Sequence, residues 1–265
     1  MATEKDLIVT LSVSPSCVTF TLNSYSNPMK NAILVILLCV SISCQQQKYD
    51  TIVRGGMVYD GSGKEPAVQD IGINGDTIAF IGDLSDAAGG NEVNASGLAV
   101  APGFINMLSW ASETLATDGN AQSDIRQGVT LEIFGEGQSM GPLNPQMKSD
   151  LQDEIDRDPD IRYDIDWTTL AEYLKSLERR GVSPNVASFV GATTLRLHEV
   201  GAENREATPD QLERMKRLVR QAMEDGAMGV GASLIYPPAT FSTTEELIEL
   251  CKVAGEYGGI YITHM

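Results

Sequence analysis

The sequence predicts an α/β fold with a parallel sheet, and three observations support this prediction. From Pro102 onward, short apolar strands alternate with amphipathic helical segments, as in strands joined by helical crossovers. The stretch 226–265 reads as one strand, loop, helix, strand unit of the βαβ kind. The chain has 265 residues, of which 42% are hydrophobic and 21% charged, enough for one large domain or two smaller ones with a core.

The first 44 residues are expected to lie outside the folded body. Residues 1–28 are polar and unperiodic, and we expect a spurious or disordered extension before a true start at Met29. Residues 29–44 have a basic start, an apolar run too short to span a bilayer, and small residues before Cys44, as in a secretory signal. This ending resembles a bacterial lipobox, which predicts lipidation at Cys44 and an exported periplasmic or cell-surface lipoprotein of a bacterium. An ordinary cleaved signal peptide is the alternative.

Residues 49–100 predict a small β-domain. Glycine, Asp and Asn punctuate three short strands, and Asn74-Gly75-Asp76 is a hairpin signal. The expected strands are Asp50–Asp60, Asp70–Asn74 and Thr77–Gly82. The apolar run Leu98–Leu108 then predicts a strand that is buried on both faces.

Residues 101–265 predict strands alternating with helices. After the run at Phe104, the expected strands are Val129–Phe134, Asn185–Val190, Met228–Leu234 and Ile260–Thr263. The expected helices are Gln122–Gln127, Thr168–Arg180, a long helix to about Asp225 with Thr208 as N-cap and Pro209 next, and Thr243–Tyr257. Five strands can build an open doubly wound sheet or a barrel cut short of eight. No G-x-G-x-x-G follows the first strand, so a dinucleotide site has no support.

Charge and cysteine content exclude some partners. The formal net charge is -17, which argues against nucleic acid or an anionic membrane surface as a partner. Three of the four cysteines precede residue 45, so the body has no disulfide framework. Cys251 falls on a helical pattern, and we expect a buried structural thiol.

Four motifs carry a family resemblance. They are the opening D-T-I-V-R-G-G-M-V-Y-D-G-S-G, then V-A-P-G-F-I, G-A-M-G-V with L-I-Y-P-P, and G-G-I-Y-I-T-H-M. Together they resemble the amidohydrolase superfamily, and more narrowly its N-acyl-D-amino-acid deacylases, over Tyr49–Met265. The resemblance implies a β-sandwich containing residues 49–100 and a TIM-like (β/α)8 barrel, present here as the incomplete part 101–265 with about five strands. It also implies Zn2+, taken here as one ion, whose bound water attacks the amide of a small-molecule N-acyl amino acid.

The resemblance also implies metal ligands. His264 matches the family's Thr-His motif and is the first expected ligand, with a core histidine as the alternative. The first barrel strand of the family ends in two histidines, where this chain has Leu108 and Trp110, neither of which binds metal. Glu136 stands where the family has a metal-binding Cys, and it is the expected replacement ligand or else a solvated loop acid. Glu132 is a weaker candidate on the same strand.

Two residues are expected to bind substrate. Arg196 lies in a match to the family's Val-Gly-His-x-x-Leu-Arg, and it could bind a substrate carboxylate or form a structural salt bridge. Tyr236 resembles the family's substrate-contacting loop residue, with packing as the alternative role. His198, two residues beyond Arg196, is expected on a surface loop.

The resemblance therefore predicts an enzyme that hydrolyses linear amides, with one alternative. Further ligands and a general-base Asp are expected beyond Met265, so the catalytic base is not among these residues, and the chain by itself is expected to be an inactive fragment. The alternative is a non-catalytic surface binding module that has lost its metal site, because a shared fold does not establish catalysis.

Overall fold

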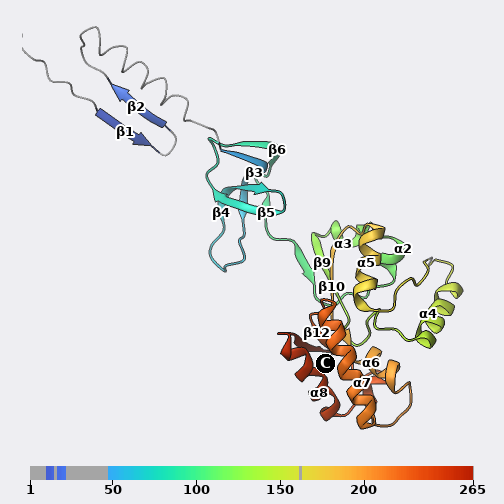
Figure 1. Cartoon of the computed structure of the whole chain (residues 1–265). Helices are drawn as coiled ribbons and strands as arrows, with labels where there is room; N and C mark the ends of the chain where they lie inside the picture. Colours follow the sequence, from blue (N-terminus) through green and yellow to red (C-terminus); the bar gives the residue numbers. More distant parts are fainter. Residues whose placement is uncertain (1–9, 15–16, 22–46, 161–162, 265) are drawn as a thin grey trace, which may run out of the picture. The chain divides into compact units, whose positions relative to one another are not determined.

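The computed structural model describes residues 10–14, 17–21, 47–160 and 163–264. The chain divides between Pro102 and Gly103 into two compact units (Figure 1). Strands β1 (Thr10–Ser14) and β2 (Cys17–Thr21) pair antiparallel. These ten residues are the part of the predicted extension 1–28 that the structure describes, and its assignment as a spurious or disordered extension stays a prediction. The predicted signal segment 29–44, with Cys44, lies outside the described residues.

The first unit contains a five-stranded mixed sheet. Its order is β5-β4-β3-β6, with β7 also pairing with β3. The strands are β3 (Lys48–Val58), β4 (Ala67–Asn74), β5 (Thr77–Gly82), β6 (Ala88–Asn94) and β7 (Ala99–Val100). The pairing of β3 with β4 shifts register between Val53 and Gly56, at Gly55, whose φ of 64° is left-handed. This bulge lets the first part of β3 pair with β6 and the last part with β7.

Two predictions for this region change. The run Leu98–Leu108 is not one buried strand: it contributes β7 to the first unit and β8 (Phe104–Asn106) to the second. Pro102 and Gly103 interrupt it, and Phe104 and Ile105 are exposed. Strand β6 was not predicted, because its sequence AGGNEVN lacks an apolar alternation. The five strands form one sheet, and the expected sandwich stays a prediction.

The second unit is built on parallel strands in chain order. One sheet has the order β10-β9-β8 and the other β11-β12-β13. Their bounds are β9 (Val129–Phe134), β10 (Asn185–Ser188), β11 (Val190–Gly191), β12 (Gly229–Ala232) and β13 (Ile260–Thr263). Met228, directly before β12, donates its N–H to the carbonyl of Ser188 in β10 at 2.9 Å, so the two sheets adjoin and the described strands keep their chain order. A doubly wound sheet reverses its strand order, and that alternative is excluded.

Helices connect these strands. Their bounds are α2 (Thr114–Thr117), α3 (Gln122–Ile125), α4 (Pro145–Arg157), α5 (Leu170–Arg180), α6 (Ala192–Glu199), α7 (Pro209–Glu224), the 3-10 turn η1 (Ala239–Phe241) and α8 (Thr244–Glu256). Helix α7 begins as predicted: Thr208 accepts from the Gln211 N–H, and the Gln211 side chain accepts from the Thr208 N–H. Helices α4 and α6 were not predicted.

The core of this unit lies between the strands and helices. Trp167 is almost fully buried, stacks on Tyr163 and contacts Tyr173. Its indole N–H donates to the Met140 carbonyl at 2.6 Å, which satisfies the polar end of the ring.

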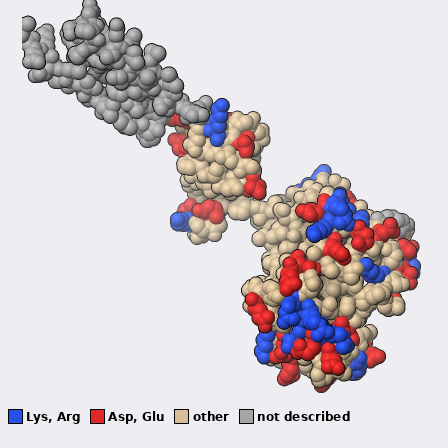
Figure 2. All heavy atoms as spheres, in the orientation of Figure 1, with Lys and Arg blue, Asp and Glu red and all other residues tan. Residues whose placement is uncertain are grey.

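Outside the core, acidic and basic side chains intermingle on the visible face of this unit (Figure 2). Lys216 of α7, for example, pairs with Glu213 and with Glu249 of α8. No helix among the described residues is long and apolar enough to cross a membrane.

Candidate functional site

In the loop after β9, Glu136 lies between Gly135 and Gly137, two positions whose backbone geometry and surroundings require glycine. Gly135 and Gly137 have φ values of 92° and 93°, in the left-handed region. A Cβ on Gly135 would lie 2.1 Å from the Phe189 carbonyl oxygen, and one on Gly137 would lie 2.6 Å from Ser233 Oγ. The Ser233 hydroxyl donates to the Glu136 carbonyl at 3.0 Å. The backbone of Glu136 is therefore held tightly against the ends of the neighbouring strands.

His264 reaches the same place from the end of β13. Its backbone N–H donates to the Ala232 carbonyl at 2.9 Å, which continues the ladder with β12. Its Nδ1 lies 3.3 Å from Glu136 Oε1. The structure thus brings together the two expected metal ligands, which lie far apart in the sequence.

The donor set fits part of a zinc site. The side chain of Glu136 is only 10% exposed, and its Oε2 is buried without a hydrogen-bond partner in the described structure. A buried carboxylate oxygen without a partner is costly, and a cation would satisfy it. Donors about 2.0–2.1 Å from one tetrahedral zinc ion lie about 3.4 Å apart, close to the observed 3.3 Å. Within the described ranges no group of three His, Cys, Asp or Glu could hold a metal, so Glu136 and His264 alone do not complete a zinc site.

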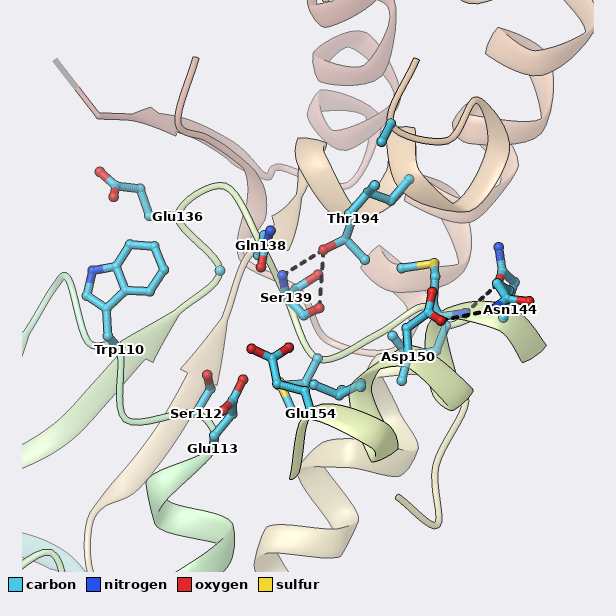
Figure 3. A pocket seen from close by; sticks show the side chains of 18 of the residues that line it. Trp110, Ser112, Glu113, Glu136, Gln138, Ser139, Asn144, Asp150, Glu154 and Thr194 are labelled. Atoms are coloured by element: carbon cyan, nitrogen blue, oxygen red, sulfur yellow. Dashed lines mark hydrogen bonds between the residues drawn. The ribbon is translucent and has the colours of Figure 1, made fainter. Parts of the chain in front are cut away.

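A pocket with a volume of about 610 Å³ opens beside Glu136 (Figure 3). Its walls are the loops after β8 and β9, one face of α4, and the beginning and end of the α6 region. The residues lining it are Ser109, Trp110, Ser112, Glu113, Gly135, Glu136, Gln138, Ser139, Met140, Leu143, Asn144, Gln146, Met147, Asp150, Leu151, Glu154, Thr194, Leu197, Gly201 and Ala202.

The buried ring of Tyr173 and the partly buried amide of Asn144 hold the pocket walls. The Tyr173 hydroxyl donates to the Ser112 carbonyl at 2.7 Å, behind the loop after β8. Asn144 caps α4 by accepting from the Met147 N–H, and its amide also donates to the His198 carbonyl at 3.1 Å. This second bond ties α4 to α6. The pocket is therefore built on fixed elements rather than on free loops.

The lining of the pocket is acidic. It contains four carboxylates and no Lys, Arg or His. Glu113 is half-buried, and this burial, with the charges of Glu154 and Asp158 nearby, raises its pKa above the ordinary value. The lining therefore repels anions.

Comparison with known proteins decides the family. No protein-family model matches the chain. A D-aminoacylase of Alcaligenes xylosoxydans xylosoxydans is 40% identical over 223 residues, which are 83% of this chain and 45% of that protein. A solved structure of D-aminoacylase superposes with a TM-score of 0.71 at 33% identity, over 82% of this chain and 45% of that one. A solved structure of N-acyl-D-glutamate deacylase from Bordetella bronchiseptica, complexed with zinc and a phosphonate inhibitor, has a TM-score of 0.69 at 26% identity, over 83% of this chain and 45% of that one.

The chain is a D-aminoacylase-like amidohydrolase. It spans about half the length of the curated relatives it matches.

In this D-aminoacylase-like chain, the other predicted site residues have different positions. Tyr236 is exposed, and its ring centroid lies 6.1 Å from that of His264, so it borders the candidate metal site. Glu132 is buried on β9 and accepts from the Asn106 amide at 3.0 Å, with its other oxygen unpartnered. Trp110 is 63% exposed and lies at the pocket beside Glu136 (Figure 3).

Arg196 requires a correction. Its side chain is fully buried, and its guanidinium donates to both carboxylate oxygens of Glu246 and to the Arg205 carbonyl. No surface of the guanidinium remains for a substrate carboxylate, so the salt-bridge alternative describes it. His198 is also not on a surface loop: it lies in α6, partly buried, with Nδ1 3.0 Å from Glu199 Oε1.

The acidic pocket wall of this amidohydrolase was not predicted from the sequence. Glu113 and Glu154 belong to segments for which no element was predicted, α4 in the case of Glu154. One signal was available, because Asn144 followed by Pro145 is an N-cap and first-turn proline pair. From that start, residues 147, 150, 151 and 154 fall on one helical face.

Proposed function

We propose that the protein is a zinc-dependent hydrolase that cleaves the amide bond of N-acyl-D-amino acids. The single observation that carries the proposal is the pair of Glu136 and His264 at the ends of β9 and β13, 3.3 Å apart beside a pocket of about 610 Å³. Groups that act on substrate collect at the carboxyl ends of parallel strands in barrel folds. The zinc complex of the related N-acyl-D-glutamate deacylase supports the choice of metal.

Glu136 and His264 would hold one zinc ion, with a further ligand from outside the described residues. When bound, zinc supplies Lewis acidity toward the amide carbonyl and the attacking water. One ion agrees with the one-metal activation described for a D-aminoacylase with a binuclear centre. A general-base Asp would also come from outside the described residues. With β10 and β11 counted as one strand interrupted at Phe189, the strands of the second unit would form five of the eight strands of a (β/α)8 barrel.

The chain's own residues would position the reaction. Ser233 fixes the backbone of Glu136 through its carbonyl, and Ala232 fixes the backbone of His264. Tyr236, exposed beside His264, would contact the bound amide. The acyl amino acid would occupy the pocket next to Glu136, where its side chain is enclosed by α4 and the loop after β8.

Zinc binding and hydrolysis test this proposal together. The chain has two histidines, so His198→Asn is a matched control for His264→Asn. We expect His264→Asn to weaken zinc binding, measured by calorimetry, by at least about tenfold, in line with the loss of one ligand, and His198→Asn to leave it unchanged. A longer protein that also supplies the further ligand and the general base should hydrolyse N-acetyl-D-amino acids only with zinc bound, whereas the 265-residue chain alone should not hydrolyse them. Ligand binding without zinc binding or hydrolysis would favour the non-catalytic binding module instead.

Export and lipidation are part of the proposal and rest on the sequence of residues 29–44. Lipid at Cys44 would tether the protein to a membrane surface. Metabolic labelling with a fatty acid should label the protein that retains Cys44 and leave the Cys44→Ser variant unlabelled. Equal labelling of both would exclude Cys44 as the anchor.

A further inference from the structure

Trp110 exposes a large aromatic ring at the pocket. Its side chain is 63% exposed, it belongs to the lining, and its ring lies beside Glu136 in Figure 3. Among the described residues, its indole N–H has no hydrogen-bond partner. The other tryptophan, Trp167, is almost fully buried and donates its N–H to the Met140 carbonyl. Trp110 therefore has both its ring and its N–H available for a ligand.

The loop that carries Trp110 is fixed on both sides of the ring. Before it, the Ser109 N–H donates to the Ile133 carbonyl of β9 at 2.9 Å. After it, the Ser112 carbonyl accepts from the Tyr173 hydroxyl at 2.7 Å. Isolated exposed apolar side chains are common on protein surfaces. A rigid aromatic ring on an anchored loop is a better contact surface than most, because little conformational entropy is lost when a ligand covers it.

The position of this ring determines which part of a substrate can reach it. In the proposed function the amide carbonyl lies at Glu136 and His264, so Trp110, beside Glu136, is next to a group bonded to that carbonyl. The carboxylate of the amino acid is disfavoured there, because the lining holds four carboxylates and no Lys, Arg or His. The uncharged acyl group carries no such penalty. With the amino-acid side chain enclosed by α4, the open ring of Trp110 is left for the acyl group.

We propose that Trp110 is a specificity-determining residue that contacts the acyl group, so that aromatic acyl groups such as benzoyl are preferred over saturated groups of similar size. This inference rests on the proposed function for the position of the amide. Two aromatic rings attract each other beyond the effect of the area they bury, and a saturated ring lacks this attraction. The pocket volume of about 610 Å³ is in the range that holds a drug-sized ligand, which leaves room for such an acyl group beside the amino-acid side chain.

Calorimetric titration of the 265-residue chain tests the inference without relying on catalysis. The probes are N-benzoyl-D-leucine, its saturated analogue N-cyclohexanecarbonyl-D-leucine, and N-acetyl-D-leucine. We expect the benzoyl compound to bind about three- to tenfold more tightly than the saturated analogue, as an aromatic pair implies, and the acetyl compound to bind most weakly. Because Trp167 is buried in the core, the change in tryptophan fluorescence on binding should come from Trp110 and be absent from the Trp110→Leu variant.

Matched variants locate the effect. Trp110→Leu keeps an apolar side chain without an aromatic ring, and it should reduce the ratio of benzoyl to cyclohexanecarbonyl affinity to about one. Trp110→Phe should keep a ratio above one, because it restores an aromatic ring. Tyr257→Leu removes an exposed aromatic ring at the end of α8, outside the lining, and should leave the ratio unchanged.

Three results would overturn the inference: equal binding of the benzoyl and cyclohexanecarbonyl compounds, a ratio that persists in Trp110→Leu, or no binding of any probe. A preference that depends on Trp110, found without hydrolysis of these compounds by a longer, zinc-loaded protein, would leave the inference standing as a binding preference. That result would count against the proposed function alone.

Discussion

The guanidinium of Arg196 donates to both carboxylate oxygens of Glu246, at 2.9 and 3.3 Å, and both side chains are buried. This pair joins α6 to the first turn of α8. A buried ion pair strongly penalises the loss of one partner, because the other charge is left in the interior.

Removing one partner should therefore destabilise the protein more than removing both. We expect Glu246→Ala to lower the free energy of unfolding by about 3–5 kcal/mol, measured by urea denaturation. The double variant Arg196→Met with Glu246→Leu should lose less free energy of unfolding than Glu246→Ala, because it leaves no unpaired charge in the interior. The exposed pair of Lys252 and Glu249 is the control, since Lys252→Ala should cost under about 1 kcal/mol. A loss from the double variant larger than that from Glu246→Ala would contradict this account.

The glycines beside Glu136 predict a second effect on stability. Gly135→Ala combines a left-handed φ with a Cβ 2.1 Å from the Phe189 carbonyl oxygen. Gly181→Ala has a similar φ of 77° but no atom within 4 Å of its Cβ, so it isolates the backbone strain. We expect Gly181→Ala to lower the free energy of unfolding by about 1 kcal/mol. Gly135→Ala should lower it clearly more, as measured by thermal unfolding. Zinc binding should weaken only in Gly135→Ala.

Asn144 should couple helix capping to the pocket. Asn144→Ala removes the cap bond to the Met147 N–H and the bond to the His198 carbonyl, and we expect it to cost at least about 1 kcal/mol. Asn144→Ser keeps a capping hydroxyl but cannot reach His198, so it should recover the capping part only. Urea denaturation of the three proteins checks the order. Equal stability of the alanine and serine variants would show that the cap contributes nothing.

Glu113 predicts a pH dependence with a definite sign. Burial and nearby acids raise its pKa above 4.5 in the folded protein, so the folded state binds this proton more tightly than the unfolded chain. The free energy of unfolding contributed by Glu113 must then fall as pH rises from 4.5 through the raised pKa. The Glu113→Gln variant lacks this titratable group. Its free energy of unfolding should therefore rise relative to that of the original chain as pH increases from 4.5 through the raised pKa. Denaturation of both proteins across pH 4 to 8 is the measurement. A difference in free energy of unfolding that stays constant with pH would contradict the prediction.

The two outer strands of the second unit predict self-association. Among the described strands, β8 pairs only with β9 and β13 only with β12, and Phe104, Ile105 and Ile260 are exposed on them. Open edges with apolar side chains favour pairing between chains. Light scattering of the purified chain should show oligomers, and Phe104→Lys with Ile260→Lys should reduce them. A soluble monomer with cooperative unfolding would contradict the prediction that β8 and β13 are open edges.

The sequence by itself determined the local elements whose signals are short in range. The bounds of β5, β9 and β13 and the start of α7 at Thr208 and Pro209 follow the prediction, because apolar runs, turn residues and caps act within a few residues. Helix α4 could have been predicted from Asn144 as N-cap and Pro145 as first helical residue. Motifs also indicated the family and selected Glu136 and His264 as candidates.

Only the tertiary structure decided which of these residues meet. Strand register brings His264 to within 3.3 Å of Glu136, while burial against α8 commits Arg196 to Glu246. The acidic pocket exists because α4 packs beside the loop that carries Glu113. Such contacts join residues distant in the sequence, and their free energies depend on burial and charge in the folded state, which no local pattern encodes.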